Sequence, residues 1–209
     1  MLRIGLTGSM GAGKSTVARL LRQRGCPVLE ADEVVRELTR PGSPALLEII
    51  AAFGAGFMSP GGELDRRRLA DFVFADPNRL ERLNRILHPR VLERFRSWLQ
   101  EQERAGSLVA VVEAPLLIES GYHRELDRLV VVWCRPEQQF ERLAARGLSA
   151  EEVQARLQFQ MPAEAKRALA DDCIDNSGTL EETAQQVAVL LERWQQLARA
   201  RESAGEGAR

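Results

Sequence analysis

Residues 8–16 most constrain what this chain can fold into, because Gly-Ser-Met-Gly-Ala-Gly-Lys-Ser-Thr fits the pattern G-x-x-x-x-G-K-[ST]. An apolar segment, residues 2–7, precedes the pattern, and residues 17–21 follow it with the apolar spacing of a helix. In a strand, glycine loop and helix of this kind, backbone N–H groups and the positive end of the helix converge on phosphate oxygens. The alternative, a chance glycine turn before an ordinary helix, is disfavoured by this context.

The loop and the first helical turn supply the predicted nucleotide-binding residues: Gly8, Gly11, Ala12, Gly13, Lys14, Ser15 and Thr16. Lys14 is expected to reach the β- and γ-phosphates, and the Ser15 hydroxyl to hold Mg²⁺. The chain has 29 Lys+Arg residues, yet only Lys14 and Lys166 are lysines. A lysine therefore stands where a compact ammonium suits a phosphate.

Composition excludes several classes of protein. A net charge of −1 gives no basic field for nucleic acid, and no apolar run approaches the ~20 residues of a membrane span. The first predicted strand begins too early for a signal peptide, and three widely spaced cysteines indicate free thiols in a reducing compartment. We expect a cytoplasmic monomer or weak homo-oligomer with no nucleic-acid or membrane partner.

Short apolar runs alternate with helical patterns along the chain. The predicted strands are residues 3–7, 27–30, 108–113, 128–134 and 172–175. This alternation predicts a three-layer α/β fold with a five-stranded parallel sheet covered on both faces. The longest gap predicts helices over 45–53, 64–74 and 77–103, with a break near His88 and Pro89. Thr179 and Glu182 predict a capping box that begins a final helix over 179–200.

We expect one domain over residues 1–202, followed by a disordered tail over 203–209. Its core comprises about 1–40, 106–135 and 170–200. A helical insertion covers about 41–105, and a second helical segment covers about 136–169.

Polar residues follow several of the predicted strands, and in an open parallel sheet ligands bind beyond these carboxyl ends. Asp32 follows the second strand, where a carboxylate can orient an acceptor hydroxyl and take its proton. Alternatively, Asp32 is an N-cap for a helix that begins at Glu33, although Val35 does not complete a capping box.

Arginines in residues 136–169 allow two interpretations. Arg142 and Arg146 are four apart and would share a helix face, from which they could close on phosphates. They could equally form a solvated face paired with glutamates, which is favoured for any single arginine in an arginine-rich chain. Arg66, at a predicted helix start, could likewise grip an anionic acceptor or face water.

The ordered set of motifs resembles the dephospho-CoA kinase family over about residues 3–190. The segments that carry the resemblance are Ile4–Thr16 around the glycine loop, Ala31-Asp32, Leu64-Asp65-Arg66, Phe72-Val73-Phe74, Leu87-His88-Pro89, 113–119, Arg156, Gln160-Met161-Pro162, Lys166, Ala170-Asp171 and 174–178. The glycine loop alone is shared by many enzymes, whereas the ordered set is far more specific.

The resemblance implies transfer of the γ-phosphate of ATP to the ribose 3′-hydroxyl of dephospho-CoA, giving CoA and ADP, with Mg²⁺ as cofactor. It implies that Asp32 is the catalytic base, that 136–169 form a lid and that the insertion binds the CoA acceptor. The implied residues comprise Lys14, Arg142, Arg146 and Asn176 for the nucleotide, and Asp32, Arg66, His88, Pro115 and Leu116 for the acceptor.

Four positions depart from the family pattern: Glu30 replaces an aspartate, Ser9-Met10 replaces Gly-Ile and Ala114 replaces a valine. The longer Glu30 carboxylate could alter metal geometry, whereas the other changes leave the assigned chemistry intact. The competing functions are another small P-loop kinase, acting on a nucleoside monophosphate or shikimate, and a P-loop NTPase used as a conformational switch.

Overall fold

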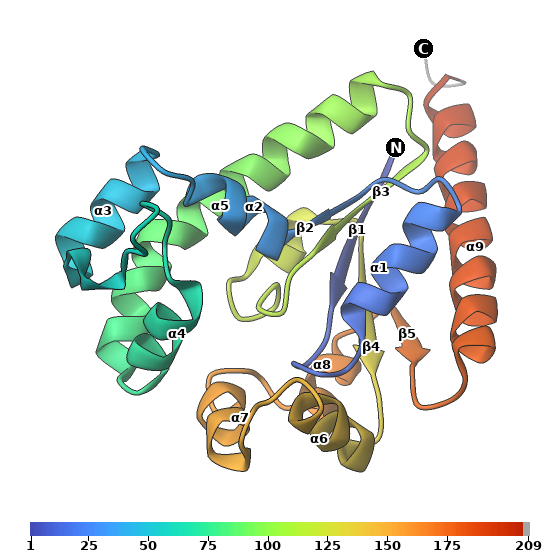
Figure 1. The fold of residues 1–209 in the computed structure, drawn as a ribbon. Coiled ribbons are helices and arrows are strands. Elements are labelled where there is room, and N and C mark those ends of the chain that lie inside the picture. Colours follow the sequence, from blue (N-terminus) through green and yellow to red (C-terminus); the bar gives the residue numbers. More distant parts are fainter. Residues whose placement is uncertain (207–209) are drawn as a thin grey trace. The chain divides into compact units, whose positions relative to one another are not determined.

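The computed structural model describes residues 1–206. They divide into two compact units, one formed by Met1–Glu30 with the residues from Trp98 onward, the other by Ala31–Ser97. We call these the sheet unit and the helical unit. Figure 1 labels their elements.

The sheet unit is built on five parallel strands, which confirms the predicted α/β class. The strands are β1 (Leu2–Thr7), β2 (Val28–Glu30), β3 (Val109–Glu113), β4 (Arg128–Trp133) and β5 (Asp172–Asp175), in the order β2-β3-β1-β4-β5. All four neighbouring pairs are parallel. Every residue of β3 is buried, as expected for an inner strand covered on both faces.

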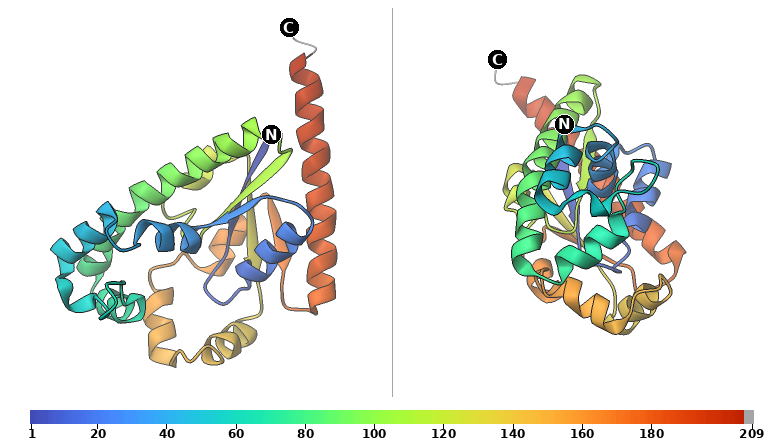
Figure 2. Two further views of the ribbon diagram at one scale, coloured as in Figure 1. Left: turned by 45° about the horizontal axis from the view of Figure 1, so that its top comes forward. Right: turned by 60° about the vertical axis from the view of Figure 1, so that its left-hand side comes forward.

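Two helices pack along the same side of this sheet, α1 (Lys14–Gln23) and α9 (Leu180–Glu206), as Figure 2 shows. Leu2, Ile4 and Leu6 alternate toward them along β1, and together with Leu21 and Trp194 they belong to one buried core. Burial of each large aliphatic side chain contributes about 1.5–3 kcal/mol, so this layer holds β1 firmly at the centre of the sheet.

The predicted capping box of α9 is confirmed. Thr179 Oγ1 accepts from the Glu182 amide at 3.2 Å, and the Thr179 amide donates to Glu182 Oε2 at 2.7 Å. The predicted tail is wrong for residues 203–206, because α9 continues to Glu206, and residues 207–209 lie outside the described residues. Of the helices within residues 1–206, none is long and apolar enough to cross a membrane.

Between β4 and β5 the chain forms α6 (Pro136–Ala144), α7 (Ala150–Leu157) and α8 (Ala163–Ala168), the segment predicted to be helical. A 3-10 turn, Tyr122–Glu125, lies between β3 and β4. Ser149 is the N-cap of α7 and forms a complete capping box with Glu152, so the Glu152 side chain is hydrogen-bonded within its own helix start.

The helical unit contains α2 (Ala31–Leu38), α3 (Pro44–Phe53), a 3-10 turn (Ala55–Phe57) and α4 (Arg66–Phe74). It also contains most of α5 (Pro77–Arg104), which ends in the sheet unit. Ser43 caps α3 and Asp65 caps α4, each through its side chain. Ile49, Leu69 and Val73 form its buried centre, surrounded by partly buried phenylalanines and leucines.

The predicted helix break near His88 and Pro89 is wrong, since α5 is continuous through Pro89. Proline in a helix interior removes one hydrogen bond and costs about 3 kcal/mol. The residues on both sides offset this cost by packing: Ile86 and Leu87 contact the centre of the helical unit, and Val91 and Phe95 are buried. Tertiary burial therefore overrides the local signal.

Candidate active site

The glycine loop follows β1 and ends at Gly13, which precedes α1 and has the left-handed angles φ 98° and ψ 26°. A Cβ at this position would lie 1.8 Å from Nδ2 of Asn176, closer than any non-bonded contact allows. Only glycine satisfies both conditions. The loop is therefore fixed against the residue that follows β5, at the carboxyl edge of the sheet.

Lys14 is held inside the loop that it closes. Its Nζ donates to the Ser9 carbonyl at 3.4 Å and lies 3.8 Å from Oε1 of Glu113. Glu113 ends β3, and its side chain is only 7% exposed. The ammonium thus lies beside a buried carboxylate, at the neighbouring strand end, in a position where a phosphate would be its second anionic partner.

Asn176 links the loop to β5 and α9. Its Nδ2 donates to the Ala12 carbonyl at 2.9 Å, and its Oδ1 accepts from Thr183 Oγ1 at 3.0 Å. Arg142 of α6 donates from Nη2 to the Asn176 carbonyl at 2.9 Å. The structure therefore brings together three predicted nucleotide-site residues: Ala12, Asn176 and Arg142.

The second nitrogen of the Arg142 guanidinium, Nη1, is buried and has no hydrogen-bond partner among the described residues. It lies 3.6 Å from the position that a Cβ on Gly13 would occupy. A buried cationic N–H group left unsatisfied is costly in a folded protein. Its position beside the glycine loop fits an anionic ligand that completes its hydrogen bonding.

Arg146 does not share a helix face with Arg142, so that prediction is wrong. Helix α6 ends at Ala144, and Arg146 is exposed in the turn that follows. Gly147, with φ 78°, ends the helix, and Leu148 donates back to the Leu143 carbonyl at 3.2 Å. The helix ends two residues before Arg146, too early for the four-residue spacing to apply.

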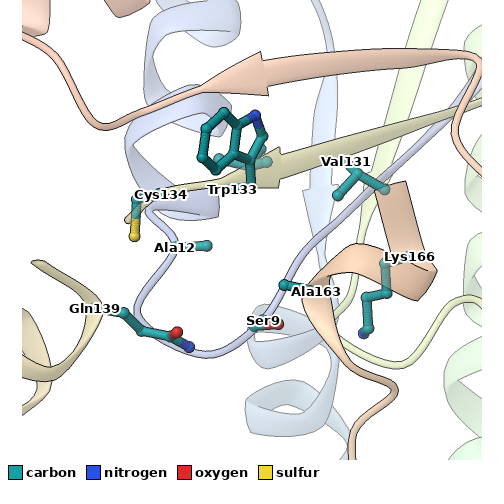
Figure 3. A pocket seen from close by; sticks show the side chains of 9 residues that line it. Ser9, Ala12, Val131, Trp133, Cys134, Gln139, Ala163 and Lys166 are labelled. Carbon is teal, nitrogen blue, oxygen red and sulfur yellow. The ribbon is translucent and has the colours of Figure 1, made fainter. Parts of the chain in front are cut away.

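A small pocket lies behind the loop, shown in Figure 3. It is lined by Ser9, Ala12, Val131, Val132, Trp133, Cys134, Gln139, Ala163 and Lys166. The loop, the end of β4 and two helices of the 136–169 segment therefore meet at this point. Burial raises the pKa of the Cys134 thiol above its ordinary value, and its Sγ lies 3.8 Å from the Gly11 carbonyl. We assign it a packing role beneath the loop.

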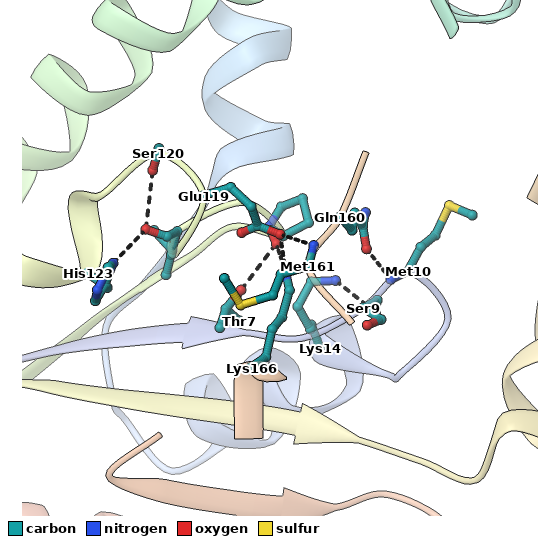
Figure 4. Close-up of polar contacts among 12 residues, drawn as sticks. Thr7, Ser9, Met10, Lys14, Glu119, Ser120, His123, Gln160, Met161 and Lys166 are labelled. Atoms are coloured by element: carbon teal, nitrogen blue, oxygen red, sulfur yellow. Dashed lines mark hydrogen bonds and ion pairs between the residues drawn. The ribbon is translucent and has the colours of Figure 1, made fainter. Parts of the chain in front are cut away.

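Sequence reasoning assigned no role to four polar groups at this site: Glu113, Glu119, Gln139 and Gln160. All but Gln139 lie in segments that carry the family resemblance. Figure 4 shows the contacts of Glu119 and Gln160 near the loop. Pro115, a predicted acceptor residue, uses its carbonyl to accept from Thr7 Oγ1 at 3.3 Å and from Lys166 Nζ at 2.5 Å. Leu116, which follows it, is partly buried. Two sequence signals marked Lys166: the rarity of lysine in this chain and its place among the residues that carry the family resemblance.

The remaining predicted acceptor residues, Asp32, Arg66 and His88, lie in the helical unit. Burial lowers the pKa of Arg66, Arg36 lowers it further, and Asp32 and Glu63 oppose the shift. Arg66 and Asp32 are therefore close enough to interact electrostatically. Burial also lowers the pKa of His88, which favours its neutral form.

Asp32 lies in the first turn of α2, which begins at Ala31. It therefore does not cap a helix that begins at Glu33, and the capping alternative is wrong. Glu30, which ends β2, pairs through Oε1 with Nη1 of Arg22 at 2.5 Å. The longer side chain at position 30 thus extends to an arginine of α1.

A magnesium ion fits the donor set of the loop. Within residues 1–206, no group of three or more His, Cys, Asp or Glu side chains could hold a metal by itself. A P-loop site needs no such group, because Mg²⁺ takes most of its ligands from phosphates and water. Ser15 is exposed at the start of α1, directly after Lys14, and offers the hydroxyl that this arrangement requires.

Comparison with known proteins gives one consistent family. A sequence model described as dephospho-CoA kinase matches residues 2–182. Dephospho-CoA kinase of Thermobifida fusca is 47% identical over 200 residues, covering 95% of this chain and 98% of that protein. Dephospho-CoA kinase of Geobacillus kaustophilus is 40% identical over 197 residues, covering 94% and 98%.

Solved structures agree on the fold. The crystal structure of TT1252 from Thermus thermophilus superposes with a TM-score of 0.74 at 39% identity, covering 92% of this chain and 97% of that chain. Dephospho-CoA kinase from Campylobacter jejuni gives a TM-score of 0.68 at 24% identity, covering 93% and 97%. Shikimate kinase from Acinetobacter baumannii gives 0.51 at 20% identity, covering 92% and 94%. The last two likenesses concern the fold alone.

Proposed function

The chain belongs to the dephospho-CoA kinase family, and from this premise we propose how its residues share the phosphorylation of dephospho-CoA. The reaction is ATP-dependent and converts dephospho-CoA to CoA, with ADP as the second product. The phosphate acceptor is the ribose 3′-hydroxyl. Gly8, Gly11, Ala12, Gly13, Lys14 and Thr16 would contact the phosphates of ATP.

The observation that carries the assignment of the nucleotide site is the orphaned Nη1 of Arg142 beside Gly13. A phosphate oxygen there would satisfy this donor and would also face Lys14, whose ammonium now lies near Glu113. Two fixed cations would then stabilise the charge that develops on the transferred phosphoryl group. Arg146 stays a predicted phosphate contact, supported by its charge alone.

On the acceptor side, Asp32 would orient the ribose hydroxyl and accept its proton as the bond to the γ-phosphorus forms. ADP leaves as the bond between that phosphorus and the β,γ-bridging oxygen breaks. The electrostatic coupling of Asp32 with Arg66 supports a polar acceptor surface in the helical unit. We assign Arg66, His88, Pro115 and Leu116 to acceptor binding.

The Ser15 hydroxyl would hold Mg²⁺ with the phosphate oxygens, and the ion would supply charge neutralisation at the β- and γ-phosphates. We propose a cytoplasmic enzyme that acts as a monomer or weak homo-oligomer. A net charge of −1 supports partners that are small molecules and not nucleic acids.

The proposal is tested by measuring ADP release with Mg·ATP and, in parallel, dephospho-CoA, AMP, CMP, shikimate or no acceptor. We expect turnover with dephospho-CoA alone. Turnover with another acceptor would replace the proposed substrate, and ADP release that ignores every acceptor would indicate an NTPase switch. The same assay without Mg²⁺, in the presence of EDTA, is expected to show no turnover.

A further inference from the structure

The second of the chain's two lysines, Lys166, is completely buried, with 0% of its surface exposed. Its Nζ pairs with Oε1 of Glu119 at 2.9 Å and donates to the Pro115 carbonyl at 2.5 Å. Oε1 of Glu119 also accepts from the Met161 amide at 2.8 Å. The ammonium therefore joins α8, the segment after β3 and the chain that leads into α8, as Figure 4 shows.

An ammonium is an expensive way to fill a core position. The free energy needed to remove a charge from water offsets much of the attraction in its ion pair. An apolar side chain of similar volume in the same place is therefore often as stabilising, or more so. Burial lowers the pKa of Lys166, and Glu119 opposes the shift, which reflects this competition. Apart from Lys14, every basic side chain of this class in the sequence is arginine, yet a lysine stands here, where two oxygen atoms contact its ammonium.

The segment that Lys166 and Glu119 hold is connected to the glycine loop at one residue, Met10. Gln160 Oε1 accepts from the Met10 amide at 3.1 Å, and Gln139 Nε2 donates to the Met10 carbonyl at 2.5 Å. Both glutamines belong to the 136–169 segment, one from α6 and one from the chain before α8. Both backbone polar groups of Met10, its amide and its carbonyl, are therefore hydrogen-bonded to this segment. Gln160 directly precedes Met161, whose amide donates to Glu119.

We infer that Lys166 is a positioning residue that, through Glu119, holds residues 160–162 against the glycine loop and thereby sets the affinity of the loop for nucleotide. We call the Lys166–Glu119–Met161 contacts the latch. With the latch in place, Gln160 fixes Met10, and the loop amides that follow stay oriented for phosphate. This role rests on the proposed function, because it presupposes that the loop binds a nucleoside triphosphate.

The test compares the wild-type enzyme with Lys166→Met and with Glu119→Leu, which removes the oxygen that accepts from both Lys166 and Met161. Isothermal titration calorimetry gives the Kd for Mg·ADP, and steady-state kinetics give separate KM values for ATP and dephospho-CoA. Val187→Ala is the matched control, since Val187 is fully buried in the core of the sheet unit and belongs to neither the latch nor the loop. Melting temperatures of all variants show how much stability each one loses.

We expect Lys166→Met and Glu119→Leu each to raise the Kd for Mg·ADP and the KM for ATP at least about fivefold, with a smaller change in the KM for dephospho-CoA. The double variant should be little worse than the poorer single variant, because both changes open the same latch. Val187→Ala should lose stability but keep its nucleotide affinity.

Equal nucleotide affinities in the latch variants and in Val187→Ala would overturn the inference and leave Lys166 a structural residue. If Lys166→Met fails to fold, Glu119→Leu decides, because it keeps the bond from Lys166 to Pro115. Unchanged kinetics in that variant would also overturn the inference. If the wild-type enzyme bound Mg·ADP but did not phosphorylate dephospho-CoA, the proposed function would fail, while the expected pattern of Kd values would still support the latch.

Discussion

Gly13→Ala tests the loop geometry most sharply, because Gly25→Ala provides a matched control: Gly13 precedes α1, and Gly25 follows the other end of the same helix. Both glycines have positive φ, 98° at Gly13 and 75° at Gly25. A Cβ at Gly13 would lie 1.8 Å from Asn176 Nδ2, whereas a Cβ at Gly25 would have no atom within 4 Å. Both variants incur the backbone strain, and only Gly13→Ala displaces a neighbour.

The strain of an alanine in the left-handed region costs about 1–2 kcal/mol in either variant. In Gly13→Ala, Asn176 must also move, which breaks its 2.9 Å bond to the Ala12 carbonyl. Loss of that hydrogen bond and of partners for buried polar groups adds about 2 kcal/mol. For a chain of this length, the added cost lowers the melting temperature by about 4–8 °C relative to Gly25→Ala.

Urea unfolding gives the two stabilities, and calorimetric titration with Mg·ADP gives the two affinities. We expect Gly13→Ala to be less stable than Gly25→Ala by about 2 kcal/mol and to bind Mg·ADP at least ten times more weakly than it. Equal stabilities together with equal affinities would refute the proposed packing of Asn176 against the loop.

Three further variants test the remaining assignments. Lys14→Ala should keep its circular dichroism spectrum but lose at least about a hundredfold in kcat, because it removes a cation from the transferred phosphate; near-normal turnover would exclude the loop mechanism. Asp32→Asn should lower kcat by about 10²–10⁴-fold with little change in the KM for ATP, and a loss of thermal stability alone would contradict the base role. Burial raises the pKa of Cys26 from 9.0 to about 12. Above pH 9 the unfolded chain therefore releases a proton that the folded chain retains, so wild-type stability should fall by about 1.4 kcal/mol per pH unit relative to Cys26→Ala until about pH 12. Urea unfolding at pH 8 and pH 10 measures this change, and a constant difference between the two proteins would contradict it.

Local sequence signals sufficed for the sheet and the loop. Parallel strands buried on both faces are short apolar runs, and all five were found near their observed bounds. The glycine loop could be predicted from the sequence because phosphate binding fixes the spacing of its glycines and lysine. The capping box of Thr179 and Glu182 could be predicted because it involves only residues three apart in the sequence.

Features that depend on distant residues were missed. Pro89 stays within α5 because burial on both sides offsets the lost hydrogen bond. The pairing of Lys166 with Glu119 joins positions 47 residues apart by sequence number, so no local pattern could reveal it. Arg146 is different, because Gly147 directly after it was a readable signal that α6 ends there.

The most direct measurement of the central claim is the stoichiometry and position of phosphate transfer, followed by mass spectrometry and ³¹P NMR. With equal amounts of dephospho-CoA and Mg·ATP, we predict one ADP for each CoA, with the new phosphate on the ribose 3′-oxygen. ADP formed in excess of CoA, or phosphate on any other oxygen, would contradict the claim that this chain phosphorylates dephospho-CoA at that hydroxyl.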